Sequence, residues 1–345
     1  MTDGGERLIV VGGRQRKKAL DLDEWQAYEK GIILVVDTQN GNAEVVEEYS
    51  SPKEVCADES PSIVFKAGEL AEDGKHLVLC TQTEVMEYRI ADWKPTFYFS
   101  HPTFNDLHHV CYRSSDLDGK KLLVANTGLD QVVELSCDLE RNEQSAICRQ
   151  WSVCEEETWT RFDHNIDYRK VATTKPHLAH PNFVFEYENE IYVTRFHQQD
   201  AIELVSREKS LNISAGNPHD GVVRDAFTLF TTTNGHLVKF NLSTGECSKT
   251  VDLNQYSQGD ELLGWCRGVL PMNDEQVWVG FSRIRPTWMR KNLSWIKQGF
   301  RNLGQYGTLP TRIAQYDLNS QTLIRELDLE KFGMNAVFGI YLLQQ

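Results

Sequence analysis

LHHVCYR (107–113), KLLVANTG (121–128), QVVELSCDL (131–139) and CRQWSV (148–153) follow one another with short breaks between them. Each run is short and rich in Val, Leu, Ile and aromatic residues, and turn-forming residues such as Gly, Asn, Asp and Ser punctuate the series. Such runs are typical of β-strands joined by turns. We therefore interpret these four strands as one structural unit that can recur along the chain.

The same four-strand unit recurs along most of the sequence. One copy precedes it, at 61–100, and three follow it, at 182–215, 221–253 and 267–329. The turn NLSTGE (241–246) has a glycine, Gly245, where a tight turn needs positive φ. Repeats of about 40–50 residues with four strands each predict the blades of a β-propeller.

The two ends of the chain supply the remaining strands. The N-terminal part offers only three, RLIVVGG (7–13), GIILVVDTQNG (31–41) and AEVVEEY (43–49), and the C-terminal part offers one, AVFGIYLL (336–343). If residues 337–342 pair with 7–12 as the innermost strand of the first blade, the ring closes and its edges are covered. We therefore predict an all-β, six-bladed propeller spanning 1–345 as a single domain. A seven-bladed ring has no unassigned segment to build from.

Two segments interrupt the repeats. Residues 155–176 lie between the third and fourth blades, and residues 285–311 separate the second and third strands of the last blade. Within the latter, apolar residues recur at helical spacing and alternate with basic ones, which predicts an amphipathic helix over 288–303. We expect both insertions on the top face, with the helix as a lid over the channel. Homodimerisation through the same helix is the alternative.

Charge and composition narrow the range of possible binding partners. The chain has 36 Lys and Arg against 50 Asp and Glu, a formal net charge of −14, which disfavours binding to nucleic acid. No stretch approaches the ~20 apolar residues that a membrane span requires. The N-terminus lacks the features of a signal peptide, and the 8 cysteines include no C-x-x-C pair. We therefore expect a cytoplasmic protein with a small-molecule ligand.

Four first strands open with a polar residue at matching positions. These residues are His108, His180, His219 and Arg267. In a propeller each first strand starts at the top of the channel, so we expect the four side chains to share one site there. We further expect nearby residues to bind substrate: Trp265, His177, His197, Asn182, Asp220 and Asn126.

Two kinds of chemistry suit this set. His108, His180 and His219 are candidate ligands for Zn, Fe or Cu, because three neutral imidazoles leave open positions for substrate. Alternatively the histidines act as acid and base while Arg267 holds a carboxylate or phosphate. A purely structural role, in which the histidines tie neighbouring blades together, is the alternative interpretation of the same pattern.

Several blade starts also resemble a family of largely uncharacterised bacterial six-bladed propeller proteins. That family has H-D-V, H-x-N and P-H motifs at blade starts and an R-G-L…V-G-x-S-x-x-R block. Here His108-His109-Val110, His180-Pro181-Asn182, Pro218-His219 and Arg267-Gly268 with Gly280, Ser282 and Arg285 take these places. His109 departs from the usual acid. The resemblance covers residues from 105 onward and implies the fold and a shared face. More distantly, the architecture is similar to strictosidine-synthase-like and gluconolactonase-like propellers, although the paired acidic metal ligands of the latter are not evident.

The sequence therefore predicts an enzyme with a His-rich, metal-dependent or acid–base site at the top of the channel, acting on a polar or anionic metabolite. The alternative is a non-catalytic propeller that binds a protein or glycan on the same face.

Overall fold

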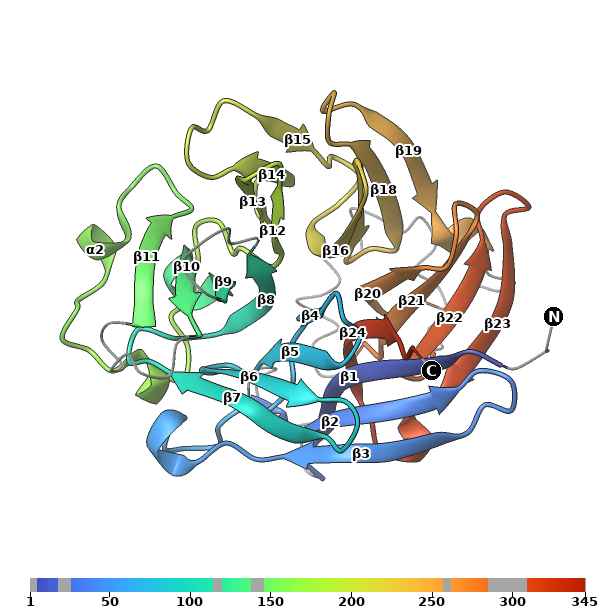
Figure 1. Ribbon diagram of the computed structural model, residues 1–345, viewed down its shortest axis with the longest axis horizontal. Helices are drawn as coiled ribbons and strands as arrows, with labels where there is room; N and C mark the ends of the chain where they lie inside the picture. The colour runs from blue at the N-terminus through green and yellow to red at the C-terminus, as the bar shows by residue number, and fades with distance from the viewer. Residues whose placement is uncertain are drawn as a thin grey trace.

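The computed structural model describes residues 5–17, 26–113, 120–137, 146–256, 262–284 and 309–344. They form six antiparallel sheets of four strands each, arranged around a central axis (Figure 1). The predicted six-bladed propeller is confirmed.

The four strands of each blade follow one another from the axis outward. The first blade contains β24 (Ala336–Leu342), β1 (Arg7–Gln15), β2 (Tyr28–Asp37) and β3 (Ala43–Tyr49). The second contains β4 (Glu69–Leu70), β5 (His76–Cys80), β6 (Glu84–Arg89) and β7 (Lys94–Ser100). The third contains β8 (Leu107–Arg113), β9 (Lys121–Asn126), β10 (Gln131–Ser136) and β11 (Ile147–Ser152).

The second half of the ring repeats this order. The fourth blade contains β12 (Val184–Tyr187), β13 (Glu190–Arg195), β14 (Asp200–Glu203) and β15 (Ser210–Asn212). The fifth contains β16 (Pro218–Arg224), β17 (Phe227–Thr232), β18 (His236–Asn241) and β19 (Cys247–Asp252). The sixth contains β20 (Trp265–Pro271), β21 (Gln276–Ser282), β22 (Arg312–Asp317) and β23 (Thr322–Asp328).

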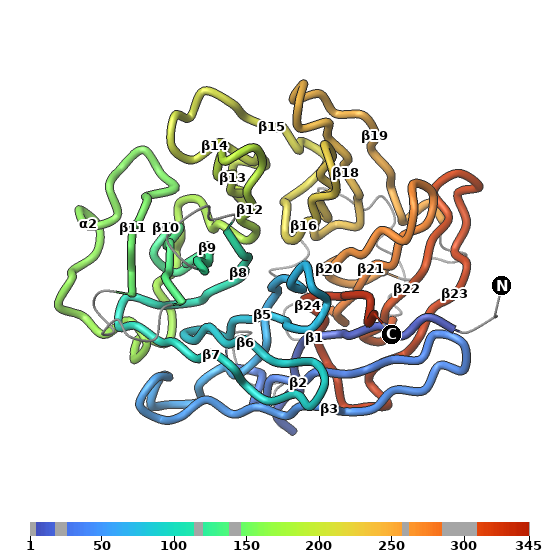
Figure 2. Tube along the Cα trace, viewed as in Figure 1, coloured from blue at the N-terminus to red at the C-terminus, as the bar shows by residue number. Residues whose placement is uncertain are grey.

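The last strand closes the ring as predicted. β24 runs antiparallel to β1, with Leu8 opposite Leu342, Val10 opposite Ile340 and Gly12 opposite Val337. Figure 2 shows the two ends of the chain, blue and red, side by side in this blade. Because β24 pairs with β1, the inner edge of β1 is covered.

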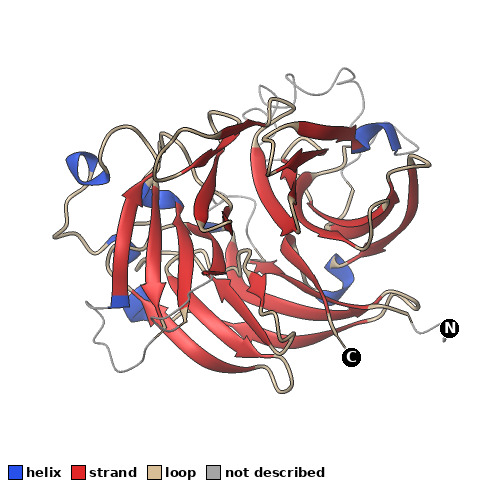
Figure 3. Cartoon of the chain, turned by 45° about the horizontal axis from the view of Figure 1, so that its top comes forward, coloured by secondary structure: helices blue, strands red, loops and turns tan. Residues whose placement is uncertain are grey.

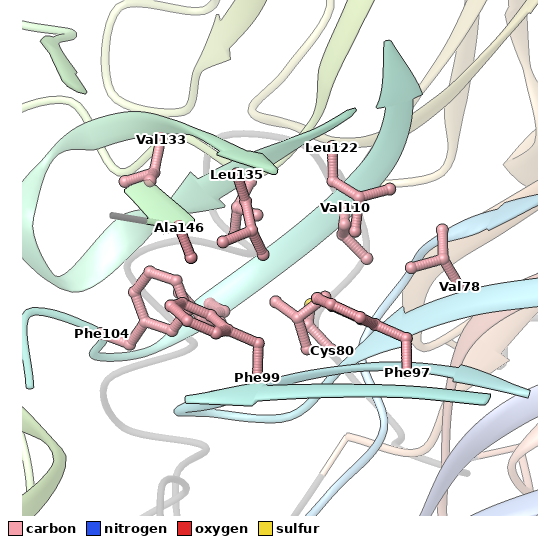
Figure 4. Close-up of a cluster of buried hydrophobic side chains, with 13 residues drawn as sticks. Val78, Cys80, Phe97, Phe99, Phe104, Val110, Leu122, Val133, Leu135 and Ala146 are labelled. Carbon is pink, nitrogen blue, oxygen red and sulfur yellow. The ribbon is translucent and has the colours of Figure 1, made fainter. Parts of the chain in front are cut away.

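The core lies between blades, which explains why the strands are apolar on both faces. Along β1, Ile9 and Val11 pack against the second blade, and Leu8 and Val10 pack against the sixth. Each of the six interfaces has a cluster of this kind. Figure 4 shows the one between the second and third blades, where Phe97 and Phe99 of β7 face strands of the next blade. Successive residues of a strand are therefore buried against opposite neighbouring blades.

Helices are short in the described residues (Figure 3). They are α2 (Thr158–Arg161) and the 3₁₀ turns Lys53–Val55, Thr127–Leu129, Tyr168–Lys170, Leu253–Tyr256 and Glu330–Phe332. None of the helices in this part of the chain is long and apolar enough to cross a bilayer. The helix predicted over 288–303 lies outside the described residues.

Candidate functional site

A cavity of about 500 Å³ lies at the axis, at the end where the innermost strands begin. Seven of the predicted site residues line it: His108, His177, His180, His197, His219, Trp265 and Arg267. Lys175 and Pro176, the last residues of the 155–176 insertion, line it as well. The ring therefore brings residues from the third to the sixth blades to one place.

The imidazoles contact one another. The ring centroid of His108 lies 5.0 Å from that of His180 and 5.6 Å from that of His219. His180 also lies 4.9 Å from His177 and 6.0 Å from His197, between ring centroids. Side chains that are 111 positions apart in sequence, from 108 to 219, thus belong to one cluster.

His180 differs from the expectation that it opens a strand. β12 begins only at Val184, and His180 sits in the preceding connection with φ at 56°. The carboxylate of Asp130 fixes this connection by accepting the backbone N–H groups of Leu178, Ala179 and His180 at 2.8, 3.0 and 2.8 Å. Arg161 of α2 donates to the same carboxylate at 2.8 Å. His180 therefore reaches the cavity through a turn and not through strand equivalence.

His108 and His219 are each held through Nδ1. His108, on β8, donates from Nδ1 to the carbonyl oxygen of Asp106 at 2.9 Å. His219, on β16, donates from Nδ1 to Asp220 Oδ2 at 2.9 Å, and the same oxygen accepts the backbone N–H of Gly268 at 2.9 Å. Nε2 of each ring is then unprotonated and can accept a proton or a metal. This arrangement of outer acceptors is common around functional histidines.

His177 and His180 form a coupled pair. The hydroxyl of Thr174 donates to the carbonyl of Gly128 at 2.5 Å, so its oxygen accepts from His177 Nε2, at 3.2 Å. Nδ1 of His177 is then the acceptor in its 2.6 Å contact with Nδ1 of His180. Nε2 of His180 is thereby left unprotonated. The backbone that carries both rings is held in place by Asp130.

The cavity favours neutral imidazoles. Burial, reinforced by Lys66, holds the pKa of His108 well below 6.5, and burial with neighbouring His108 does the same for the pKa of His180. Burial also lowers the pKa of His177, and that of His219 in spite of its pairing with Asp220. Neutral imidazole is the form that binds metals and accepts protons.

Asp106 has the opposite tendency. Burial favours its neutral form, but His108 and Lys66 outweigh burial and lower the pKa of Asp106. Its Oδ1 lies 3.7 Å from the ammonium of Lys66 and 3.7 Å from Nδ1 of His108. An ionised carboxylate therefore lies among neutral rings in the described wall of the cavity.

One group of described side chains has metal-like spacing. Single donor atoms of Asp106, His177 and His180 all lie within 4.8 Å of one another. This group shares His180 with the predicted ligand set and contains Asp106 and His177 in place of His108 and His219. It could hold a metal ion.

Three predicted substrate-binding residues lie outside the cavity wall. Asp220 supports His219 from behind. Asn182 donates to the carbonyl of Pro218 at 3.2 Å, and Asn126 donates to the carbonyl of Thr103 at 2.8 Å and accepts from the N–H of Asn105. All three residues make contacts that join segments of the protein.

Sequence reasoning missed several residues of the wall. Lys66, Asp106, Phe196 and Phe338 all line the cavity. Lys66 carried a usable signal, because a lysine inside the apolar run SIVFKAG must be buried with a partner or a purpose. Asp106 carried a weaker one, as it shortly precedes His108 at the start of its strand. The apolar strand of Phe338 gave no such indication.

Comparisons with known proteins inform the fold alone. No protein-family model and no curated protein matches the sequence. Among solved structures, a protein of unknown function from Bacteroides caccae is similar over 99% of this chain and 100% of its own, with a TM-score of 0.60 and 13% identity. A chain in the crystal structure of a nidogen/laminin complex is similar over 98% of both chains, with a TM-score of 0.55 and 9% identity.

At these identities the likeness shows the architecture alone. The chain is a six-bladed β-propeller with a His/Asp cluster at one end of its channel. The matches do not show a relationship to strictosidine-synthase-like propellers.

Proposed function

We propose that the histidine-lined cavity is the active site of an enzyme acting on a small polar or anionic metabolite. The observation that carries this proposal is the convergence of five histidines and Arg267 on one cavity of about 500 Å³. A purely structural set of blade-tying histidines would lie in separate interfaces. Cavities with a few convergent polar groups are the usual location of small-molecule sites, and their volumes lie in the range of about 300–1,000 Å³.

Asp106, His177 and His180 are the residues that would hold a divalent transition metal in this site, with the Nδ1 lone pair of His177 going to the metal in place of its contact with Nδ1 of His180. Two imidazoles and a carboxylate form a donor set that suits Zn²⁺ or Fe²⁺, and their spacing fits one ion. Cu²⁺ is the third candidate from the sequence. When bound, such a metal supplies a Lewis acid that polarises a substrate oxygen or activates water.

The remaining residues divide the other tasks. His219 accepts a proton at Nε2, and Asp220 stabilises the imidazolium that results, as paired carboxylates do for catalytic histidines. His108 provides a second imidazole that can accept a proton at Nε2, with its Nδ1 held by the carbonyl of Asp106. Arg267 orients the substrate from the wall. The exposed His197 lies at the rim, where ligands enter.

Metal analysis and ligand screening test this proposal together. Untagged protein, purified without chelators, is assayed for bound Zn, Fe and Cu, and a thermal-shift screen covers polar, anionic and neutral metabolites. We expect His180→Gln and His219→Gln to remove metal or ligand effects while unfolding free energy changes by about 1 kcal/mol or less, because glutamine can replace one hydrogen bond.

His76→Gln is the matched control. His76 lies on β5 and its side chain is 29% exposed, outside the cavity. It should retain all metal and ligand effects. If the cavity variants bind metals and metabolites like wild type, or lose stability broadly, the enzyme proposal fails and the blade-tying interpretation replaces it. Retention of a protein or glycan partner on this face, without small-molecule binding, would favour the non-catalytic alternative.

A further inference from the structure

A second pocket lies between the fifth and sixth blades, which are neighbours in the ring (Figure 1). Its volume is about 450 Å³, within the range of about 300–1,000 Å³ that small-molecule sites have. The turns that follow β16, β20 and β22 border it, so it opens at the end of the propeller opposite the histidine-lined cavity. No described residue lines both. We call this second site the interblade pocket.

One face of the fifth blade forms the floor of the interblade pocket. Four side chains that line the pocket stand in one row across the four strands, each directly opposite the next: Val222, Leu229, Lys239 and Lys249. Closer to the axial end of the interface, Leu237 is opposite Val251, and both are buried against the sixth blade. The apolar packing between the two blades is therefore closed at Leu237 and Val251 and opens into the pocket at the row of the lysines.

The two lysines of this row are direct cross-strand neighbours. Like charges opposite one another on an antiparallel pair are destabilising, so Lys239 opposite Lys249 costs stability that an anion between them would restore. The ammonium of Lys249 donates to the carbonyl oxygen of Leu318 at 3.1 Å, and that of Lys239 lies 3.9 Å from Asp274 Oδ1. The side chain of Asp274 is 98% exposed, so water screens this ion pair and it contributes little.

Positive charge lies deeper in the interblade pocket than negative charge. The described residues that line it include three cations, Lys239, Lys249 and Arg224, and two carboxylates, Asp225 and Asp274. Both carboxylates are in exposed turns, whereas the two lysines lie on the sheet face beside Leu229. On a protein of net charge −14, the charge next to the apolar floor is therefore positive.

An aromatic ring adds to the apolar surface of the interblade pocket. Phe227 lines the pocket and is 36% exposed, and the ammonium of Lys239 lies 4.6 Å from its ring centroid. Exposed apolar surface in a concave site favours a ligand with an apolar body. An inorganic anion would leave this surface in water, and a neutral apolar molecule would leave the two lysines opposed. A molecule with both an anionic group and an apolar body satisfies both.

We propose that the interblade pocket is a binding site for an amphiphilic organic anion, separate from the proposed active site. The anionic group pairs with Lys239 and Lys249, and the apolar body packs against Val222, Leu229 and the ring of Phe227. Lysine binds anions as a point charge, so a carboxylate and a phosphate monoester share the chemistry that this site recognises. The alternative is that Lys249, on the outermost strand, only protects the sheet edge, and it predicts no ligand.

Calorimetric titration of the full chain with matched eight-carbon probes tests the ligand class. The probes are octanoate, octyl phosphate, octanamide and octylammonium, with acetate as an anion that lacks an apolar body. We expect octanoate or octyl phosphate to bind, and the neutral, cationic and short probes to bind about tenfold more weakly or less. The ratio between the two anions identifies the preferred head group. Failure of both anions, or equal binding of octanamide, octylammonium or acetate, overturns the inference.

A double variant connects the binding to the lysines. Lys239→Met with Lys249→Met keeps the apolar stems and removes both charges, so affinity for the anion should fall about tenfold or more, while affinity for octanamide changes by about twofold or less. Lys94→Met with Lys209→Met is the matched control, since it removes two exposed lysines from the second and fourth blades. It should keep wild-type affinity. Wild-type anion affinity in the Lys239 and Lys249 variant overturns the inference.

The interblade pocket and the proposed active site can fail separately. His219→Gln changes the histidine-lined cavity and should keep wild-type affinity for octanoate. If octanoate binding depends on His219 and not on the two lysines, the anion enters the histidine-lined cavity and the interblade site is wrong. Metal and metabolite binding that depends on His180 and His219 supports the proposed function whichever result the octanoate titration gives.

Discussion

At the scale of single residues, the histidines of the cavity are held by acceptors that lie outside it. Asp220 fixes His219, the carbonyl of Asp106 fixes His108, and Asp130 fixes the turn that carries His180. Outer partners of this kind set the tautomer and orientation of a ring, and their loss typically weakens a site without touching it. Asp130 is therefore a positioning residue.

Asp130→Asn should disturb the site at a distance. The neutral amide cannot accept three backbone N–H groups and pair with Arg161 at once, so we expect a loss of about 2 kcal/mol in unfolding free energy. Affinity for added Zn²⁺ should fall about tenfold or more. Urea unfolding and calorimetry measure the two effects.

Asp200→Asn serves as the comparison for Asp130→Asn. It removes the ion pair of Asp200 with Arg195 on the fourth blade and should leave Zn²⁺ affinity unchanged. Unchanged affinity in Asp130→Asn would refute the positioning role.

Glu69 makes stability depend on pH. Burial raises its pKa from 4.5 to about 7, against the hydrogen bond from the N–H of Tyr112, and Glu72 and Glu186 add to the rise. Because the folded pKa lies above the unfolded one, the stabilising contribution is complete below pH 4.5 and is lost as pH rises through 7. Glu69→Gln should therefore be more stable than wild type at pH 8, by on the order of 1–2 kcal/mol, and equal to it near pH 4. Urea unfolding at the two pH values checks this, and a constant difference would contradict it.

At the scale of elements, β24 is the strand that makes the ring continuous. It covers the inner edge of β1, contributes Val337 and Ile340 to the interface with the sixth blade, and carries Phe338 to the cavity. Structural closure and the site thus depend on the same strand.

Deletion of residues 335–345 should yield insoluble protein, because β1 loses its partner and the sixth blade loses part of its packing. Deletion of 344–345 alone, beyond β24, should remain soluble. Soluble expression with size-exclusion chromatography compares them. A soluble and fully folded 335–345 deletion would show that closure is dispensable.

Gly12→Ala tests the pairing of β1 with β24 by adding one methyl group. A Cβ on Gly12 would lie 1.8 Å from the carbonyl oxygen of Ala336, so β24 must move away. We expect a loss of about 3 kcal/mol in unfolding free energy, at the upper end of overpacking effects. Gly245→Ala meets nothing within 4 Å and carries only the cost of its φ of 73°, about 1 kcal/mol. Equal losses in chemical unfolding would refute the steric explanation.

At the scale of the whole molecule, the segment 285–311 is an insertion into a complete blade. The two strands that flank it, β21 and β22, pair up to Phe281 opposite Arg312. The lid and the homodimer predicted for 288–303 both remain predictions.

Replacing 286–307 with a short Gly-Ser linker should keep unfolding free energy within about 1 kcal/mol, because loop closure entropy changes slowly with length. Light scattering and ligand titration separate the two roles. A halved mass supports the dimer, and unchanged mass with faster ligand release supports the lid. Loss of the fold would show that the segment belongs to the core.

Several features of this protein were readable from the sequence. Four-strand repeats, the lone strand 336–343 and the polar residues at strand starts predicted the six blades, the closure and the meeting of His108, His219 and Arg267. The continuous apolar run Leu8–Val11 indicates a strand buried on both faces, and repetition of the four-strand unit indicates rotation about an axis. Both signals are local and repeated, so they can be recognised in the sequence alone.

Only the tertiary structure decided how the cavity is built. His180 reaches it through a turn fixed by Asp130, 50 positions away, and Lys66 meets Phe338 across 272 positions. Asp106 joins His177 and His180 because of that same turn. No periodicity encodes such contacts, since they depend on long-range hydrogen bonds and on side-chain directions that exist only once the ring has closed.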